Sequence, residues 1–514
     1  MDRAKAKDLA ISAAIAAALA ALVTMSFWVR WRILTESPFP EGIDGYFYPI
    51  QLRSLLAHGT LAYPASPLAF WLMAPLAALT DPLTGAKLGA ALFGALIALP
   101  AYGVGARLGK SRGAGLVAAA LATTSAGSAF LTVEFVKNSV GLTVGLTALW
   151  LVLRALERPV RGRIGVALAS VVAAFLTHKM AAGIVIVIAI PAGLAEAVGQ
   201  GALRGRRLLY ALLLLGAAAI SLLVLGLVSP ERFLSPDDAG LLHAMWGEAR
   251  WDLPALGTPN ITLAMGHEAV IGAALALIAI GSRLQIVRAR FADVGLAKRS
   301  PGERVAAWVI IGLALAIALP WLAVTNPQGL GFRVRIVAFV PMALCAAIAV
   351  PVLELPFARV TSAIRTGVLA LVALAIVLAM PTDRTEGRVL AHPAMVAAVE
   401  GMAGRIPEGG IAIVPERHIA FMVTWYTGVP FRMRPEGVPR ERRWRVMPLA
   451  FIGIDSPLDQ LLMAARREPG LVPPVGTHPR HPNGLVLVAE PTWEWILARL
   501  PPEARAHFTR WPTI

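Results

Sequence analysis

The sequence contains little charge and almost no cysteine. Only 15% of its 514 residues are charged, whereas 57% are hydrophobic. In a soluble domain about a quarter of the residues are charged, so the composition excludes an ordinary soluble protein. Cys345 is the only cysteine, which excludes an intrachain disulfide and a cysteine-rich metal site.

Acidic residues are also scarce relative to basic ones. The chain has 31 Asp and Glu against 47 Lys and Arg, a formal net charge of +16. No basic run is interleaved with stacking aromatic residues, and the arginines are scattered among short segments. This pattern excludes a nucleic-acid-binding surface. The pattern instead indicates that the positive charge sets the orientation of the chain in a membrane.

Long apolar runs dominate the chain. Several reach the ~20 residues that an α-helix needs to cross ~30 Å of hydrocarbon. We predict a mainly α-helical, polytopic bundle of about eleven transmembrane helices. The runs cover residues 8–28, 86–106, 113–133, 138–156, 163–178, 180–198, 207–228, 264–281, 305–324, 334–353 and 366–381.

A further apolar run, residues 66–80, is short and is framed and interrupted by Pro67, Pro75 and Pro82. Proline breaks a helix or limits its length, so we predict an interfacial helix in the first outer loop rather than a span. If this run crossed the membrane, every later loop would change sides. Most lysines and arginines would then face outward, contrary to the positive-inside rule.

The basic residues therefore orient the bundle with its amino terminus in the cytoplasm and its carboxyl-terminal segment outside. The first run follows a basic stretch, but its length and the flank Trp28-Val-Arg30-Trp31-Arg32 favour an uncleaved anchor over a signal peptide. An outer segment without disulfides fits a bacterial plasma (inner) membrane better than a eukaryotic lumen.

The composition changes near residue 382. We predict a transmembrane domain over residues 1–381, with a first outer loop at 31–85, and a small extracytoplasmic α/β domain over 382–514. In this second domain, apolar segments typical of strands alternate with helical patterns. The strand segments are 411–414 and 485–488, and the helical patterns are 392–405, 456–467 and 491–499. The stretch 429–446, rich in Pro and Arg, is predicted to be a loop that faces solvent or lipid headgroups, or contacts an anionic substrate.

Asp44 is the first candidate catalytic residue. It lies between Gly42 and Gly45, so the backbone can turn tightly and present the carboxylate with little steric cover. Asp44 could instead be the N-cap of the amphipathic stretch Tyr46–His58. The aromatic residues that follow it would form an interfacial belt or a stacking wall: Tyr46, Phe47 and Tyr48.

Further polar residues fall at the predicted outer ends of spans. Glu134 and Lys137 flank a short turn, where they would form either a surface ion pair or part of a site. His178 and Lys179 end the fifth run. Lys179 would either reach the headgroups or bind phosphate, and His178 would carry a proton or bind phosphate.

Arg333 and Arg335 follow two glycines where the outer loop after the ninth run enters the tenth run. Guanidinium groups at this depth suit either interfacial anchoring or recognition of a lipid-linked phosphate. The long outer loop 229–263 contains Asp, Glu and His residues, but their spacing specifies no metal.

These features together resemble the GT-C superfamily of membrane glycosyltransferases. The segment Asp44-Gly-Tyr-Phe-Tyr48 with Leu52-Arg53-Ser-Leu-Leu-Ala-His-Gly59 is similar to the first outer loop of oligosaccharyltransferase catalytic subunits. The proline-bounded helix from Tyr63-Pro64 to Leu79, and the run Lys87 to Tyr102 leading into Ala106-Arg107-Leu-Gly109, follow in the order typical of the superfamily. The detailed similarity covers roughly residues 8–160, and the remainder agrees in topology only.

The resemblance implies transfer of a sugar from a polyprenyl-phosphate donor, as in protein mannosyltransferases, aminoarabinose transferases and oligosaccharyltransferases. Two departures limit it. Gly45 replaces the second member of the adjacent acidic pair found in many of these enzymes, which leaves the use of a divalent cation, Mg²⁺ or Mn²⁺, open. The Trp-Trp-Asp signature is absent, the nearest string being Thr424-Trp425-Tyr426, so transfer to asparagine is not supported.

We therefore predict an inverting glycosyltransferase that acts on a glycan, lipid or protein acceptor at the extracytoplasmic face. Asp44 would be the general base, with Glu134 as a second catalytic carboxylate. The donor phosphate would be held by Lys137, His178, Lys179, Arg333 and Arg335, and substrate by Glu41, Tyr46 and Tyr48. The alternatives are a lipid or solute transporter, and a non-catalytic membrane scaffold with an outer binding domain.

Overall fold

The computed structural model describes residues 3–40, 42, 44–203, 261–281, 300–319, 330–353, 391, 393–414, 416–448, 471–472 and 485–509, with short groups between 205 and 227, 364 and 373, and 457 and 461. The chain divides into two compact units. The first comprises Met1–Glu36 and His58–Glu386, and the second comprises Ser37–Ala57 and Gly387–Ile514. The second unit therefore combines part of the predicted first outer loop with the carboxyl-terminal segment.

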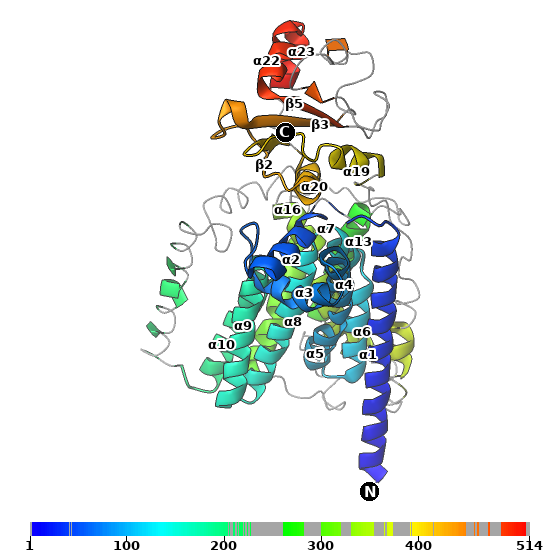
Figure 1. Ribbon diagram of the computed structural model, residues 1–514. Coiled ribbons are helices and arrows are strands. Elements are labelled where there is room, and N and C mark those ends of the chain that lie inside the picture. Colours follow the sequence, from blue (N-terminus) through cyan, green and yellow to red (C-terminus); the bar gives the residue numbers. More distant parts are fainter. Residues whose placement is uncertain are drawn as a thin grey trace. The chain divides into compact units, whose positions relative to one another are not determined.

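The first unit is built of helices in the part of the chain that the structure describes (Figure 1). They are α1 (Arg3–Thr35), α3 (Leu68–Leu79), α4 (Pro82–Leu96), α5 (Ala98–Gly109), α6 (Arg112–Thr124), α7 (Ala126–Glu134), α8 (Val136–Glu157), α9 (Arg161–Thr177), α10 (Lys179–Gly199), α13 (Ile261–Gly281), α15 (Pro301–Ile317), α16 (Leu330–Ile336) and α17 (Phe339–Leu353).

Five of the described helices are long and apolar enough to cross a membrane. A sixth span results if α6 and α7, which are bent by 45° at their junction, are counted together. The five are Asp8–Thr35, Pro82–Gly109, Val136–Glu157, Lys179–Gly199 and Gly331–Pro351. Each coincides with a predicted run, and the bent pair coincides with the run 113–133.

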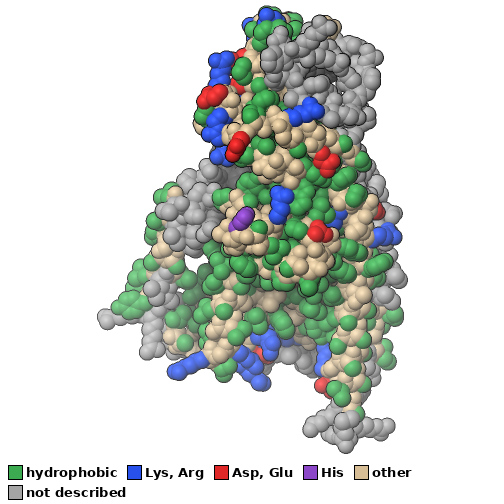
Figure 2. Space-filling model, in the orientation of Figure 1, with side chains coloured by type: hydrophobic (Ala, Val, Ile, Leu, Met, Phe, Trp, Pro, Cys, Tyr) green, Lys and Arg blue, Asp and Glu red, His purple; other side chains and the backbone are tan. Residues whose placement is uncertain are grey.

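Three further predicted runs are helical: α9 and α15 have 17 residues each, and α13 has 21, of which His267–Gly281 form a shorter apolar helix. The runs 207–228 and 366–381 fall mostly outside the described residues. The total of about eleven spans therefore stays a prediction. In Figure 2, hydrophobic side chains cover most of the visible middle of the helical unit, and Lys and Arg gather at its lower end.

The predicted interfacial segment forms α3, a helix of 12 residues with Pro75 inside it. At ~1.5 Å per residue it is too short to cross the hydrocarbon. Its partner is α4, and a Cβ atom on Gly85 of α4 would lie 2.3 Å from the Cα atom of Ala77. Glycine at position 85 is therefore needed for this close approach.

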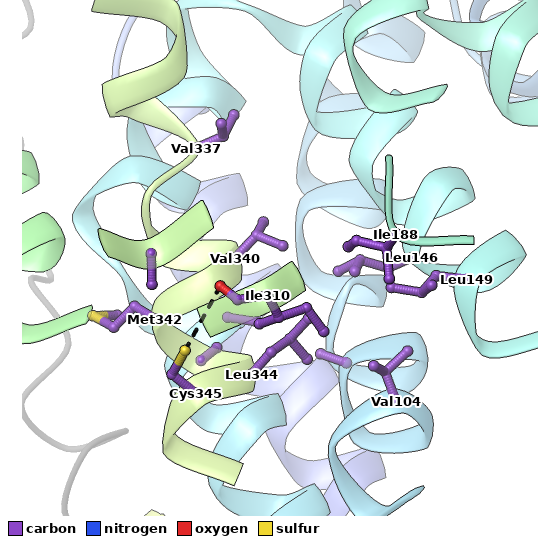
Figure 3. Packing of buried hydrophobic residues seen from close by; sticks show 14 of the residues in the cluster. Val104, Leu146, Leu149, Ile188, Ile310, Val337, Val340, Met342, Leu344 and Cys345 are labelled. Atoms are coloured by element: carbon purple, nitrogen blue, oxygen red, sulfur yellow. Dashed lines mark hydrogen bonds between the residues drawn. The ribbon is translucent and has the colours of Figure 1, made fainter. Parts of the chain in front are cut away.

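The core of the first unit is formed where α5, α8, α10, α15 and α17 meet (Figure 3). Ile188 of α10 lies against Leu146 and Leu149 of α8, and Leu344 of α17 lies near Ile310 of α15. Cys345 is completely buried here, with its Sγ atom 4.0 Å from the carbonyl oxygen of Ile310. This cysteine therefore packs as a small hydrophobic side chain.

The second unit contains a five-stranded sheet in the order β2-β1-β3-β5-β4. Strand β1 pairs parallel with β2 and β3, and β5 pairs antiparallel with β3 and β4. The strands are β1 (Ile411–Ile413), β2 (Phe431–Arg432), β3 (Arg443–Pro448), β4 (Leu471–Val472) and β5 (Leu485–Ala489). The helices are α2 (Phe47–His58, to Ala57 in this unit), α19 (Pro393–Glu400), α20 (Arg417–Thr427), η3 (Arg440–Arg442), α22 (Glu490–Arg499) and α23 (Pro502–Thr509).

The predicted strands at 411–414 and 485–488 and the helix at 491–499 are confirmed by β1, β5 and α22. Helix α19 and a following turn confirm most of the pattern at 392–405. The pattern at 456–467 lies largely outside the described residues.

The prediction of a loop over 429–446 was wrong for two parts of the stretch: Phe431–Arg432 form β2, and Arg443 begins β3. Three of the arginines in this stretch have acidic partners: Arg440, Arg443 and Arg445. Arg445 donates to both carboxylate oxygens of Glu490, at 2.7 and 2.8 Å, and Arg440 pairs with Glu494. The interpretation that this stretch contacts an anionic substrate is weakened by these pairs.

Candidate functional site

Four side chains of the first unit form a group that we call the cationic cluster: Lys137, His178, Lys179 and Arg333. Lys137 lies in the first turn of α8, His178 immediately precedes α10, Lys179 begins α10 and Arg333 lies in α16. The positive charges of Lys137, Lys179 and Arg333 all act on the imidazole of His178. The structure thus brings together four of the five predicted phosphate-binding residues.

The fifth predicted residue, Arg335, also lies in α16. Its guanidinium Nη2 atom is 3.5 Å from the carbonyl oxygen of Leu319, which is a weak hydrogen bond at most. Its role in phosphate binding stays a prediction.

The amino-terminal ends of α8 and α10 lie side by side at the cationic cluster. A Cβ atom on Gly141 of α8 would lie 2.5 Å from the Cβ atom of His178, and Gly145 lies one turn further on against Ala181. Each helix carries a partial positive charge at its amino-terminal end, where backbone N–H groups can bind an anion. The two helix ends and the basic side chains therefore all make the electrostatic potential at the cationic cluster more positive.

The connection between α7 and α8 joins a carboxylate to the cluster. Glu134 is the last residue of α7, and only Phe135 separates it from α8. Phe135 N donates to Leu131 O at 3.1 Å, and Asn138 N donates to Phe135 O at 2.8 Å. Glu134 is partly exposed. The short break fixes it within about a turn of Lys137.

Aromatic packing joins α16 to α7 and to the α7–α8 connection. The Phe130 ring of α7 lies 5.9 Å from the ring of Phe135 and 6.0 Å from the ring of Phe332 on α16. Such edge and tilted contacts are favourable for aromatic pairs. This packing holds α16, the helix that carries Arg333, against α7 and the α7–α8 connection.

His178 has a further feature that suits a ligand. Its Nδ1 atom is buried and makes no hydrogen bond within the described part of the chain. Buried polar atoms in proteins are normally paired. An imidazole nitrogen at the beginning of two helices can donate a hydrogen bond to an anionic oxygen.

Asp44 lies in the second unit and pairs with Arg417, the first residue of α20. The Oδ1 atom of Asp44 is 2.8 Å from the Nε atom of Arg417, and the side chains are 15% and 48% exposed respectively. Gly42 has φ of +81°, a conformation that favours glycine, and its carbonyl accepts from Gly45 N at 3.0 Å. The predicted tight turn is therefore confirmed, whereas the Asp44 carboxylate is more covered than the glycines led us to expect.

Helix α2 begins at Phe47, so its N-cap position is Tyr46 rather than Asp44. The carbonyl oxygen of Asp44 accepts from Phe47 N at 3.0 Å. Asp44 therefore shapes the entry to α2 through its backbone, while its side chain reaches α20.

The predicted substrate-binding tyrosines are buried in the second unit. The hydroxyl of Tyr46 lies 3.1 Å from that of Tyr426, and the Phe47 ring lies 5.2 Å from that of Phe421. Tyr48 is also buried, with its ring 5.5 Å from that of Phe47. These contacts join α2 to α20. Substrate binding by Tyr46 and Tyr48 stays a prediction, and Glu41 lies outside the described residues.

Helix α20 supplies residues that sequence reasoning missed. Besides Arg417, its Trp425 ring lies 4.3 Å beneath the guanidinium of Arg53, whose Nη1 also donates to Trp425 O at 3.3 Å. The sequence did contain an indication of this site, because the charged residues from Glu416 to His418 follow a short apolar strand. Its pairing with Asp44 could not be read from the sequence, since nothing local connects the two segments.

Glu416 and His418 add two partly buried titratable groups next to Arg417. Burial lowers the pKa of His418 to about 4 and raises the pKa of Glu416 above its ordinary value. His418 Nδ1 lies 3.5 Å from Glu416 Oε2. Because the imidazole is neutral at pH 7, this contact is not an ion pair under those conditions.

A metal centre has no support among the residues that the structure describes. No group of three or more His, Cys, Asp or Glu side chains among them could hold a metal ion. The acidic loop 229–263 lies almost entirely outside this part of the chain.

No protein-family model matches the sequence, and no curated protein matches it. Among solved structures, the chain is similar to the oligosaccharyltransferase of Archaeoglobus fulgidus in complex with zinc and sulfate, with 14% identity and a TM-score of 0.49. That similarity covers 80% of this chain and 62% of the oligosaccharyltransferase, so the chain spans less than two thirds of that protein.

The chain is also similar to ArnT from Cupriavidus metallidurans, with 15% identity and a TM-score of 0.47. The similarity to apo ArnT covers 93% of this chain and 98% of ArnT, and for ArnT bound to undecaprenyl phosphate it covers 92% and 97%. Both neighbours are GT-C glycosyltransferases, the superfamily that the sequence resembles. At these identities, and with TM-scores below 0.5, the similarities carry no inference about what this chain binds or does.

Proposed function

We propose that the protein is an integral-membrane glycosyltransferase that uses a polyprenyl-phosphate sugar as donor. The cationic cluster binds the donor phosphate, and Asp44 is the general base for the acceptor. The bundle has about eleven spans, the amino terminus faces the cytoplasm, and the carboxyl-terminal segment is extracytoplasmic in a bacterial inner membrane. Loop charge supports this orientation.

The observation that carries the proposal is the convergence of like charges around His178. Lys137, Lys179 and Arg333 come from three different helices, and α8 and α10 both begin at this place. Cations from three helices, next to the amino-terminal ends of two helices, create a local positive potential that can attract an anion. A phosphate on an apolar tail matches both the charge and the surrounding apolar helices.

The proposed reaction divides the work between two sets of groups. Asp44 accepts the proton of the acceptor hydroxyl, and the oxygen attacks the anomeric carbon with inversion. The bond from the anomeric carbon to the phosphate oxygen breaks, and the lipid phosphate leaves with the electron pair. A positioned base supplies about 10²–10⁴-fold in rate, and the cations stabilise the charge that develops on the phosphate. Glu134 is the second candidate carboxylate.

Binding of undecaprenyl phosphate and of neutral undecaprenol to the full chain in nanodiscs tests the phosphate site. We expect the wild-type protein to prefer the phosphate. We expect Lys137→Gln and Arg333→Gln each to reduce the preference about tenfold, since a lost charge-assisted contact is worth about 1.5–3 kcal/mol.

Arg161→Gln is the matched control. Arg161 is an exposed cation at the opposite end of α9 from His178, a helix of 17 residues. Its substitution should leave the preference unchanged. Equal affinities of the wild-type protein for the two lipids would refute the proposal, as would equal effects of Arg161→Gln and Lys137→Gln.

A further inference from the structure

A buried arginine spans the bend between α6 and α7. Arg30 of α1 is 2% exposed. Its Nη2 atom donates to Thr123 O at 2.7 Å, in the last turn of α6, and to Ser128 Oγ at 2.8 Å on α7. Its Nε atom donates to Thr132 Oγ1 at 3.1 Å, also on α7. One guanidinium group therefore binds both helices of the bent pair.

A buried carboxylate binds the same bend through α7. Glu268 of α13 accepts from Gly127 N at 3.1 Å through Oε2 and from Ala126 N through Oε1. These two N–H groups belong to the first turn of α7 and have no partner within the helix. Ser125, at the break, caps α7 by accepting from Ser128 N at 3.2 Å.

Arg30 and Glu268 each complement the partial charge of the helix end that they contact. A carboxyl-terminal helix end carries partial negative charge and an amino-terminal end partial positive charge. Arg30 contacts the carboxyl-terminal end of α6, and Glu268 contacts the amino-terminal end of α7. Ionisable residues are expensive within a membrane-spanning unit and mark function by default. Arg30 and Glu268 are not members of the cationic cluster, so the proposed function does not yet account for them.

The α6–α7 bend is connected to the cationic cluster in two ways, through α16 and through α8. A Cβ atom on Gly127 would lie 2.3 Å from the carbonyl oxygen of Ile336, the last residue of α16, so the start of α7 touches the helix that carries Arg333. The other end of α7 leads through Phe135 into α8 and Lys137. A change in the bend would therefore move both Arg333 and Lys137.

We propose that Arg30 and Glu268 are positioning residues that fix the α6–α7 bend and thereby set the spacing of cations in the cationic cluster. This inference rests on the proposed function of that cluster. Neither side chain contacts the phosphate in this account, and each acts through α7.

Glu268→Gln tests the inference in the full chain, again with undecaprenyl phosphate and undecaprenol in nanodiscs. The amide keeps the size of the side chain but loses its charge and one acceptor. We expect the affinity for undecaprenyl phosphate to fall about tenfold, or about 1.4 kcal/mol, while the affinity for undecaprenol changes less than about twofold. A general loss of folding would lower both affinities.

Glu196→Gln is a closely matched control. Glu196 and Glu268 are both 7% exposed, and Glu196 accepts from Gly302 N at 2.8 Å in the first turn of α15. Its place near the far end of α10 from Lys179 separates it from the cationic cluster. We expect both lipid affinities of this variant to match those of the wild type.

Arg30→Lys and Arg30→Met provide a second comparison. Lysine keeps the charge but cannot bridge both helices as the guanidinium does, so we expect Arg30→Lys to retain part of the preference for phosphate and Arg30→Met to lose it. If Lys137→Gln abolishes the preference but Glu268→Gln behaves like Glu196→Gln, the positioning role is wrong and the phosphate site stands. If the wild-type protein shows no preference, both proposals fall.

Discussion

Asp44 shows how far local sequence can place a functional side chain. The glycines around it predicted a tight turn, and the φ of Gly42 and the bond from Gly45 N bear this out. The side chain itself is only 15% exposed, so the prediction of little steric cover was wrong. Its partner Arg417 could not be predicted, because the pairing depends on the folding of α20 against α2. For the cationic cluster, the sequence predicted which residues would gather, but not the packing of α8, α10 and α16 that brings them together.

Asp44→Asn should abolish glycosyl transfer and leave the protein folded. Asparagine has nearly the same volume but is too weak a base to take a proton from the attacking hydroxyl. We expect the rate to fall about 10²–10⁴-fold, measured as transfer of labelled sugar from a membrane lipid extract in proteoliposomes. Arg417→Gln leaves the carboxylate in place and should reduce the rate far less.

Membrane abundance and thermal unfolding of each variant serve as controls for this comparison. Full activity of Asp44→Asn at normal abundance would remove Asp44 from the mechanism and make Glu134 the next candidate. Equal losses in Asp44→Asn and Arg417→Gln would indicate that the ion pair is purely structural.

His418 predicts a pH dependence of stability in the second unit. Burial lowers its pKa to about 4 in the folded protein, against about 6.5 in the unfolded chain. The unfolded chain therefore binds more protons between pH 6.5 and pH 4, so stability is fully present above pH 6.5 and is lost as the pH falls toward 4. The loss is at most about 3 kcal/mol.

Thermal unfolding of the full chain in detergent, followed between pH 4 and pH 8, measures this effect. His418→Gln removes the titrating group and should flatten the dependence between pH 4 and pH 6.5. Glu416, whose pKa is raised by burial, acts in the opposite direction, because folding then favours its protonated form. An unchanged pH profile in His418→Gln would show that another group causes the acid sensitivity.

At the scale of elements, hydrophobic periodicity located helices and strands reliably. The long runs became α1, α8, α10 and α17 because an apolar helix has no competing structure in lipid. Strand β3 was missed because Arg443 and Arg445 made its sequence look solvated. The strand pairs with β1 and β5, and Glu490 neutralises Arg445 within it, tertiary contacts that composition does not reveal.

The ion pair between Arg445 and Glu490 should be important for the stability of the sheet. Its side chains are 11% and 5% exposed, and two hydrogen bonds join them. Removing one partner leaves a buried charge without compensation, which costs about 3–5 kcal/mol. We expect Glu490→Ala to lower the unfolding temperature of the second unit markedly, measured by limited proteolysis across a temperature series.

Glu494→Ala is the control for this prediction. Glu494 pairs with Arg440 on the surface, where the side chains are 42% and 61% exposed, and exposed pairs contribute about 0–1 kcal/mol. If both alanine variants lose the same stability, burial does not determine the contribution of the Arg445 pair.

At the scale of the whole molecule, sequence predicted a helical membrane bundle followed by a smaller α/β segment. It did not predict that residues 37–57 belong to the same compact unit as the carboxyl-terminal segment. The aromatic contacts between α2 and α20 create this association, for example between Phe47 and Phe421. Such pairing joins segments that are remote in sequence, so periodicity and composition do not report it.

The central claim is that the cationic cluster binds the phosphate of a polyprenyl donor. A cryo-electron microscopy structure of the full chain in nanodiscs with undecaprenyl phosphate tests it most directly. The account predicts phosphate oxygens at charge-assisted hydrogen-bond distances, about 2.7–2.9 Å, from at least two of Lys137, Lys179 and Arg333. A headgroup bound elsewhere on the protein, with these three side chains making no contact to it, would contradict the account.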